Sequence, residues 1–153
     1  MSHTFFFDTS ALIKFYHQEI GTDRVEAIFQ RLDTLLHISE LATVELYAAL
    51  ARKVRMKEIS LEAQQEAYRN FEDDCLHRFV IQPLTGTVIQ KAKNLVQQYG
   101  NTKAFRSLDS LQLGACLIAR TTRDWIFVCA DSRLLEVAQE EGLQGLNPED
   151  AQE

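Results

Sequence analysis

The residues of this chain best suited to chemistry are four carboxylates in unusual positions. Asp8 follows the apolar run "FFF", Asp131 follows the apolar run "WIFVCA", and Glu45 and Asp109 lie within helical patterns of apolar residues. If the four converge, each close pair repels by about 4 kcal/mol at roughly 4 Å and an effective dielectric constant of about 20. Divalent cations offset such repulsion, and hard oxygen ligands suit Mg²⁺ or Mn²⁺. A carboxylate cluster without His or Cys is the ligand set expected for metal-assisted cleavage of phosphodiesters.

Glu45 is the hardest of the four to explain as an ordinary surface residue. Its neighbours at spacings of three and four residues are all apolar, namely Leu41, Ala42, Ala48 and Ala49. Glu45 therefore lies within the stripe that should face the core. Burying an unpaired carboxylate is costly or keeps it protonated. The alternative is a partner Arg or Lys, or a stripe rotated enough to leave Glu45 at its edge.

Each of the other three acids also has a structural explanation. Asp8 and Asp131 precede predicted helices, where Asp is a common N-cap residue. Asp109 lies in the first turn of its helix, where interaction with the helix dipole contributes about 0.3–1 kcal/mol. Arg106, three residues earlier, is also placed to pair with Asp109.

The elements predicted around these acids alternate between strands and helices. Apolar runs predict strands at 3–8, 35–39, 78–84, 125–130 and, at an edge, 143–147. Helical spacing predicts helices from 9 to about 21, from 22 to about 32, and at 40–56, 61–77, 86–99, 107–121 and 132–142. The expected N-caps are Thr9 or Ser10, Ser39, Ser60 and Ser107. This alternation predicts a parallel sheet covered on both faces, a three-layer α/β/α fold whose ligands bind beyond the carboxyl ends of the strands.

Length and composition indicate one cytoplasmic domain spanning residues 1–153. The sequence has no internal repeat or linker, and no apolar run approaches the roughly 20 residues needed to span a bilayer. The N-terminus lacks the basic and apolar regions of a secretory signal, and three cysteines do not suggest a disulfide framework. The net charge of −6 argues against non-specific nucleic-acid binding and fits a protein that needs cations locally.

Four segments resemble, in order and spacing, the four acidic motifs of PIN domains. They are "FFFDTSAL", "ISELATVEL", "RSLDSLQLGACL" and "FVCADSRLLEVAQEEGL", so the resemblance runs from Phe5 to about Leu143. The chain looks most like the single-domain VapC-type toxins of toxin–antitoxin pairs. The resemblance implies a Mg²⁺- or Mn²⁺-dependent endoribonuclease with a mainly parallel five-stranded sheet between helices.

Carried over residue by residue, the resemblance makes Asp8, Glu45, Asp109 and Asp131 the catalytic and metal-binding acids. Ser10 matches a small polar residue that helps to order the site, and Arg106 matches a basic position before the third acid. Cys129 is a departure, because the family often has Thr or Ser there. A thiol is a weaker hydrogen-bonding group than a hydroxyl. The resemblance also makes Asp131 the most variable of the four acidic positions in the family.

Several partners follow from the same interpretation. Lys14, Lys103 and Arg106 are candidate RNA contacts because they flank the acidic motifs. The basic residues between 52 and 57 are further candidates, or else a solvated helix face. The family resemblance also implies a homodimer and a cognate antitoxin that covers the acidic cleft.

Two alternative functions remain open within this fold: a PIN nuclease of RNA processing or repair that is not a toxin, and a catalytically silent PIN-like protein-interaction module. Other folds have less support. A haloacid-dehalogenase-type phosphatase needs a second Asp at the position of Ser10, and a receiver domain needs an acidic pair where only Asp8 is present. The sequence has no Gly-rich nucleotide-binding loop and no nucleophile elbow.

Overall fold

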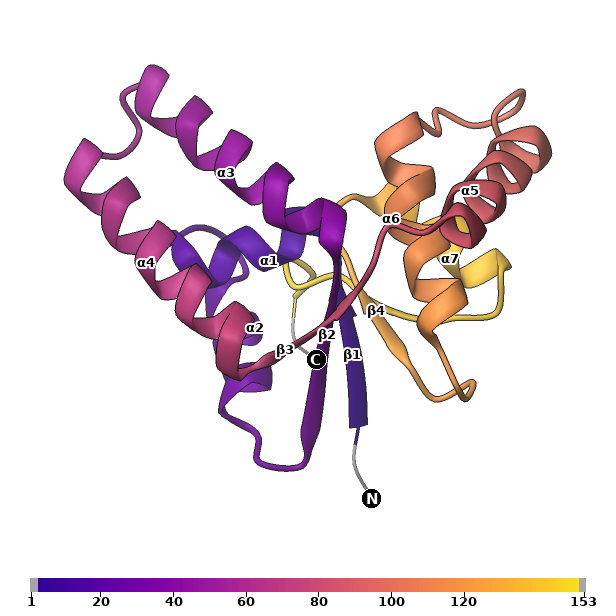
Figure 1. The fold of residues 1–153 in the computed structure, drawn as a ribbon, viewed down its shortest axis with the longest axis horizontal. Helices are drawn as coiled ribbons and strands as arrows, with labels where there is room; N and C mark the ends of the chain where they lie inside the picture. Colours follow the sequence, from indigo (N-terminus) through magenta and orange to yellow (C-terminus); the bar gives the residue numbers. More distant parts are fainter. Residues whose placement is uncertain (1–2, 152–153) are drawn as a thin grey trace.

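The computed structural model describes residues 3–151, which contain a single five-stranded sheet (Figure 1). Its strands are β1 (His3–Phe7), β2 (Thr34–Ser39), β3 (Phe79–Gln82), β4 (Ile126–Val128) and β5 (Gln144–Leu146). The spatial order is β3-β2-β1-β4-β5, and every adjacent pair is parallel. The parallel five-stranded sheet expected from the sequence is therefore confirmed.

Four of the strands are shorter than predicted: β1 and β5 lose one and two residues, and β3 and β4 lose three each, for identifiable reasons. β3 ends before Pro83, which has no N–H to donate to a neighbouring strand. β4 ends at Val128, and the N–H of Ala130 donates to the side chain of Ser10 at 2.9 Å instead of to another strand. The segment after β4 is thus redirected toward the start of the first helix.

Helices cover both faces of the sheet, as the three-layer prediction requires. They are α1 (Thr9–Tyr16), α2 (Thr22–Gln30), α3 (Glu40–Arg55), α4 (Leu61–His77), α5 (Gly86–Tyr99), α6 (Ser107–Ala119) and α7 (Ser132–Glu140). Figure 1 shows α1–α4 on one side of the sheet and α5–α7 on the other. None of the helices in the described part of the chain has the length and apolar character needed to cross a membrane.

The three phenylalanines of β1 supply both halves of the core. Phe5 and Phe7 pack with α1–α4, and Phe6 packs with α5–α7. This division follows from the two-residue repeat of a strand, which points alternate side chains to opposite faces. A central strand buried on both faces is therefore apolar throughout, and β1 lies at the middle of the sheet.

The helix N-caps differ from the prediction at two places. Asp8, and not Thr9 or Ser10, caps α1, because β1 ends directly before it and its carboxylate accepts a hydrogen bond from the N–H of Ala11. Arg106, and not Ser107, occupies the N-cap position of α6. The predicted caps of α3 and α4 are confirmed.

The first helix also ends earlier than predicted, at Tyr16 instead of near Gly21, because His17 has extended backbone angles. Gly21 has a φ of +93°, and a Cβ there would lie 2.8 Å from the carbonyl oxygen of Pro148. Arg24 donates to the carbonyl oxygens of Asn147 and Asp150. These contacts hold the segment after β5 against the turn between α1 and α2.

Candidate active site

Two of the four acids lie at the carboxyl edge of the sheet, on neighbouring strands. Asp8 directly follows β1, and its N–H donates to the carbonyl oxygen of Val128 at the end of β4. Asp131 comes three residues after β4 and caps α7. β1 lies between β2, which follows it in the chain, and β4, which comes much later. Parallel α/β sheets bind ligands at such a point, in the crevice outside the carboxyl ends of the strands.

Asp8 is a buried carboxylate held by neutral donors. It is 6% exposed, and it accepts hydrogen bonds from the hydroxyl of Ser10 at 2.5 Å and from the N–H of Ala11 at 3.3 Å. Burial and, to a smaller extent, the negative charge of Glu45 raise the pKa of Asp8 to about 6, against the lowering effect of these hydrogen bonds. The site therefore contains a carboxylate whose charge is only partly compensated.

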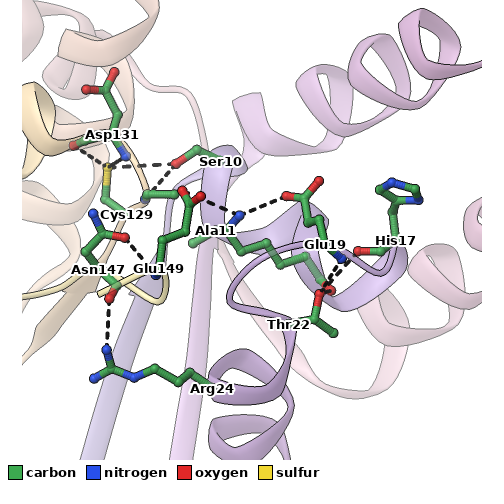
Figure 2. Close-up of polar contacts among 12 residues, drawn as sticks. Ser10, Ala11, His17, Glu19, Thr22, Arg24, Cys129, Asp131, Asn147 and Glu149 are labelled. Carbon is green, nitrogen blue, oxygen red and sulfur yellow. Dashed lines mark hydrogen bonds and ion pairs between the residues drawn. The ribbon is translucent and has the colours of Figure 1, made fainter. Parts of the chain in front are cut away.

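Ser10 and Cys129 join the end of β4 to Asp8, and Figure 2 shows both beside Asp131. The thiol of Cys129 lies 3.5 Å from Oδ2 of Asp8 and 3.3 Å from the N–H of Asp131. Burial raises the pKa of this thiol well above its usual range, and the charge of Asp8 contributes. Cys129 is therefore a neutral thiol that contacts both Asp8 and the backbone of Asp131, in the position where a hydroxyl was expected.

The charge of Asp131 acts on the carboxyl group of Asp109. Partial burial raises the pKa of Asp109, and the charge of Asp131 raises it further, while the N–H and charge of Arg106 lower it. That N–H donates to Oδ2 of Asp109 at 3.2 Å. Asp131 accepts from two backbone N–H groups in the first turn of α7. The cap interpretation of Asp131 is thus confirmed. Asp109 takes the backbone N–H of Arg106, whereas the expected pair between the two side chains does not form.

Glu45 lies at the edge of the apolar stripe of α3 and not within it. The buried residues of α3 are Ala42, Leu46 and Leu50, whereas Glu45 is only partly buried and Ala48 is exposed. The expectation that Glu45 faces the core is therefore corrected: the stripe is rotated. The rotation turns the Glu45 carboxylate toward α1 and α6, where Thr9 and Gln112 donate hydrogen bonds to it.

Gln112 is a site residue that the sequence interpretation missed. It is 2% exposed, and its amide nitrogen donates to Oε1 of Glu45 at 2.6 Å and to the hydroxyl of Thr9 at 3.0 Å. The available signal was its position three residues after Asp109, on the same face of α6. A buried amide at that spacing is unusual in an otherwise apolar helix.

No positive side chain forms an ion pair with these acids among residues 3–151, although the charge of Arg106 acts on Asp109. Within residues 3–151, none of the four carboxylates lies within 4.0 Å of a Lys, Arg or His nitrogen. The same residues contain no group of three or more His, Cys, Asp or Glu side chains arranged to hold a metal ion. The side chains thus do not meet at one point, because each carboxylate is turned toward its own hydrogen-bond donors. The set of uncompensated oxygen donors nevertheless matches the ligand preference of Mg²⁺ and Mn²⁺.

The candidate RNA-contact residues have different environments. Lys14 is buried, and its ammonium group lies 2.9 Å from Glu19 and 3.7 Å from Glu149. Lys103 pairs with two glutamates of α7. The side chain of Arg106 is exposed and pairs with no carboxylate among the described residues. Of the three, Arg106 is the one presented to solvent beside an acid of the site.

A pocket of about 590 Å³ opens beside Asp131. Its lining includes Lys14. Ser10 and Asp131 line one part of it, and Glu19 and Glu149 line another (Figure 2). Arg52 and Lys53 of α3 complete a mixed lining of positive and negative side chains. The pocket therefore extends from the carboxyl edge of the sheet to the turn between α1 and α2.

The fold and the site define an α/β/α protein with acidic residues at the carboxyl edge of a parallel sheet. The PIN domain family model matches residues 5–140. The chain is 31% identical to Ribonuclease VapC45 of Mycobacterium tuberculosis over 73% of its own length and 74% of that protein's length. This chain therefore belongs to the PIN domain family, and its curated relatives are VapC proteins.

Solved structures show the same fold. The structure of FitAcB from Neisseria gonorrhoeae superposes with a TM-score of 0.67 and 17% identity, over 94% of this chain and 97% of that one. VapBC2 from Rickettsia felis, solved with a DNA fragment, gives a TM-score of 0.62 and 15% identity, over 94% and 98% of the two chains.

The buried pair of Lys14 and Glu19 allows a test of stability. Burial alone would raise the pKa of Glu19, but Lys14 and Lys53 outweigh it and hold this pKa below its ordinary value of 4.5. We expect Glu19→Gln to reduce the free energy of unfolding at pH 7 by about 2 kcal/mol, less than the loss for a fully buried pair because Glu19 is partly exposed.

Because the folded-state pKa is lowered, this contribution is complete above pH 4.5 and disappears as the pH falls through the folded-state value. Urea unfolding of both proteins at pH 7 and at about pH 3 measures the change, and the difference between them should shrink in acid. Glu58→Gln, which removes an exposed partner of Lys53, is the matched control and should lose less than about 1 kcal/mol. An equal loss in both variants would contradict the prediction.

Proposed function

We propose that this protein is a metal-dependent endoribonuclease that hydrolyses RNA phosphodiester bonds. The observation that carries the proposal is the placement of Asp8 and Asp131 at the carboxyl edge of the sheet and of Glu45 and Asp109 on α3 and α6. None of the four forms an ion pair with a cationic side chain within residues 3–151. Membership of the PIN family and similarity to a protein named Ribonuclease VapC45 support the same activity. No nucleophilic side chain is required, because water is the attacking group in such hydrolysis.

Asp8, Glu45, Asp109 and Asp131 would hold Mg²⁺ or Mn²⁺. When bound, such a cation stabilises negative charge on phosphate oxygens and makes water a stronger nucleophile at neutral pH. The protein's own part is to keep these carboxylates in place: Ser10 and the thiol of Cys129 hold Asp8, and backbone N–H groups hold Asp131.

Two substitutions test the acids directly. Asp8→Asn and Glu45→Gln keep the size of each side chain and remove its charge. We expect each to reduce RNA cleavage in Mg²⁺ or Mn²⁺ by at least about 100-fold, because losing only an outer partner of a metal ligand already costs about 10- to 100-fold.

Asp73→Asn is the matched control, since Asp73 is an exposed acid on α4 that pairs with His77. Its rate of RNA cleavage should equal that of the unmodified protein. Full activity of both Asp8→Asn and Glu45→Gln would contradict the proposed site.

Arg106 is the side chain that we propose for phosphate contact near the acids. Its replacement by Ala should weaken RNA binding and reduce the slope of log K against log salt by about 0.7, the value for one phosphate contact on a single strand. Lys93→Ala is the control, because Lys93 is an exposed cation on α5 and is not one of the candidate RNA contacts. A salt slope identical to that of the unmodified protein would remove Arg106 from the RNA interface.

We further propose that the ribonuclease acts as the toxin of a toxin–antitoxin pair. The VapC names of the curated relatives and the VapBC2 complex among the similar structures support this role. The antitoxin would cover the acidic edge and the adjoining pocket, where a guanidinium group of the partner would compensate the carboxylates.

Expression in a bacterial host tests the toxin role. We expect growth arrest by the unmodified protein, none by Asp8→Asn at the same expression level, and relief when the small gene next to it is co-expressed. Metal-dependent RNA cleavage without growth arrest would favour a processing nuclease instead, and no cleavage at all would favour a protein-interaction module.

A further inference from the structure

The Glu45 carboxylate is held entirely by uncharged side chains. Oε1 of Glu45 accepts from the hydroxyl of Thr9 at 3.0 Å and from the amide of Gln112 at 2.6 Å. The same amide nitrogen lies 3.0 Å from the Thr9 hydroxyl, so the three side chains form a closed set of contacts. Oε2 of Glu45 takes no hydrogen bond from any other residue between 3 and 151.

These contacts connect the elements that carry three of the acids. Thr9 follows Asp8 at the start of α1, Glu45 lies on α3, and Gln112 lies one turn after Asp109 on α6. The partners are 36 and 67 residues from Glu45 in sequence. A shift of α6 relative to α3 would therefore move the Glu45 carboxylate and change its position relative to the other acids.

Gln112 is also incompletely satisfied. Its amide oxygen is fully buried and has no hydrogen-bond partner among the described residues. A buried polar atom without a partner reduces stability, and an apolar side chain at this position of α6 would avoid that loss. The Gln112 amide is therefore better explained by what its nitrogen does for Glu45 than by packing.

The kind of donor matters as well as its position. A Lys or Arg at the position of Gln112 would fix the carboxylate but would also neutralise it and compete with any cation. Neutral donors fix one oxygen and leave the negative charge available to a second partner. Outer partners of this kind orient metal-binding side chains and affect their affinity for metal.

We infer that Gln112, together with Thr9, is a positioning residue that holds Glu45 for a divalent cation without neutralising it. The inference rests on the proposed function for the identity of the cation, but its test measures metal binding separately from RNA cleavage.

The experiment titrates the full-length protein with Mn²⁺ and follows free Mn²⁺ by electron paramagnetic resonance. Gln112→Met keeps the length of the side chain and removes the donor, and we expect it to weaken Mn²⁺ binding by about 10-fold. RNA cleavage by this variant should recover toward the unmodified rate as Mn²⁺ is raised, because the substitution changes affinity and leaves the acids intact.

Gln64→Met is the matched control, since Gln64 is a buried glutamine on α4 that donates to Tyr68. It should leave Mn²⁺ affinity unchanged. Thr9→Val and Thr9→Ser provide a second test that does not depend on the folding of Gln112→Met. Valine removes the hydroxyl and should weaken binding, whereas serine keeps it and should preserve the affinity.

The outcomes separate the two proposals. Unchanged Mn²⁺ affinity in folded Gln112→Met and in Thr9→Val would overturn the positioning role, as would an equal loss in Gln64→Met or the absence of Mn²⁺ binding in the unmodified protein. Mn²⁺ binding that follows the expected order, in a protein that cleaves no RNA, would support the positioning role and reject the nuclease.

Discussion

Asp8 and Asp131 place negative charge at one edge of the parallel sheet without an ion pair to a side-chain cation within residues 3–151, and the neighbouring structure is organised around that charge. Asp8 is almost completely buried at that edge, and the charge of Glu45 adds to the unfavourable effect of burial. Such a carboxylate is tolerated only when donors or cations surround it. Here the donors are a hydroxyl, a thiol and one backbone N–H, which hold the carboxylate without neutralising it.

The lysines of the neighbouring elements are paired with other acids. Lys14 and Lys53 both contact Glu19, and Lys103 contacts glutamates of α7. These ion pairs contribute to packing around the pocket, and they also prevent the same ammonium groups from reaching the site. The edge therefore stays acidic, while the positive charges of these lysines are balanced by glutamates.

The site is assembled from elements on both sides of the sheet. α1 and α3 belong to one helical layer and α6 to the other, and their contact runs through the Glu45 carboxylate. The packing of the two helical layers therefore also determines where the acids lie. A substitution that changes the position of α6 is expected to affect the site even when it touches no acid.

Much of this arrangement follows from local pattern. The run of three phenylalanines specifies a strand buried on both faces, and the alternation of strands and helices specifies parallel pairing. Asp8 and Asp131 follow their strands, so their place at the carboxyl edge was predictable. The caps of α1 and α6 were misplaced by one residue or two, because several residues that can cap a helix stand together there.

The sequence by itself determined the parallel sheet, the order of its acidic motifs and the edge at which two of them end, since strand ends and helix starts depend on neighbouring residues. Only the tertiary structure decided the side of α3 on which Glu45 lies, its contacts with Thr9 and Gln112, and the burial of Lys14. Those contacts join residues far apart in the chain, and they depend on how the helical layers pack, which no local spacing specifies.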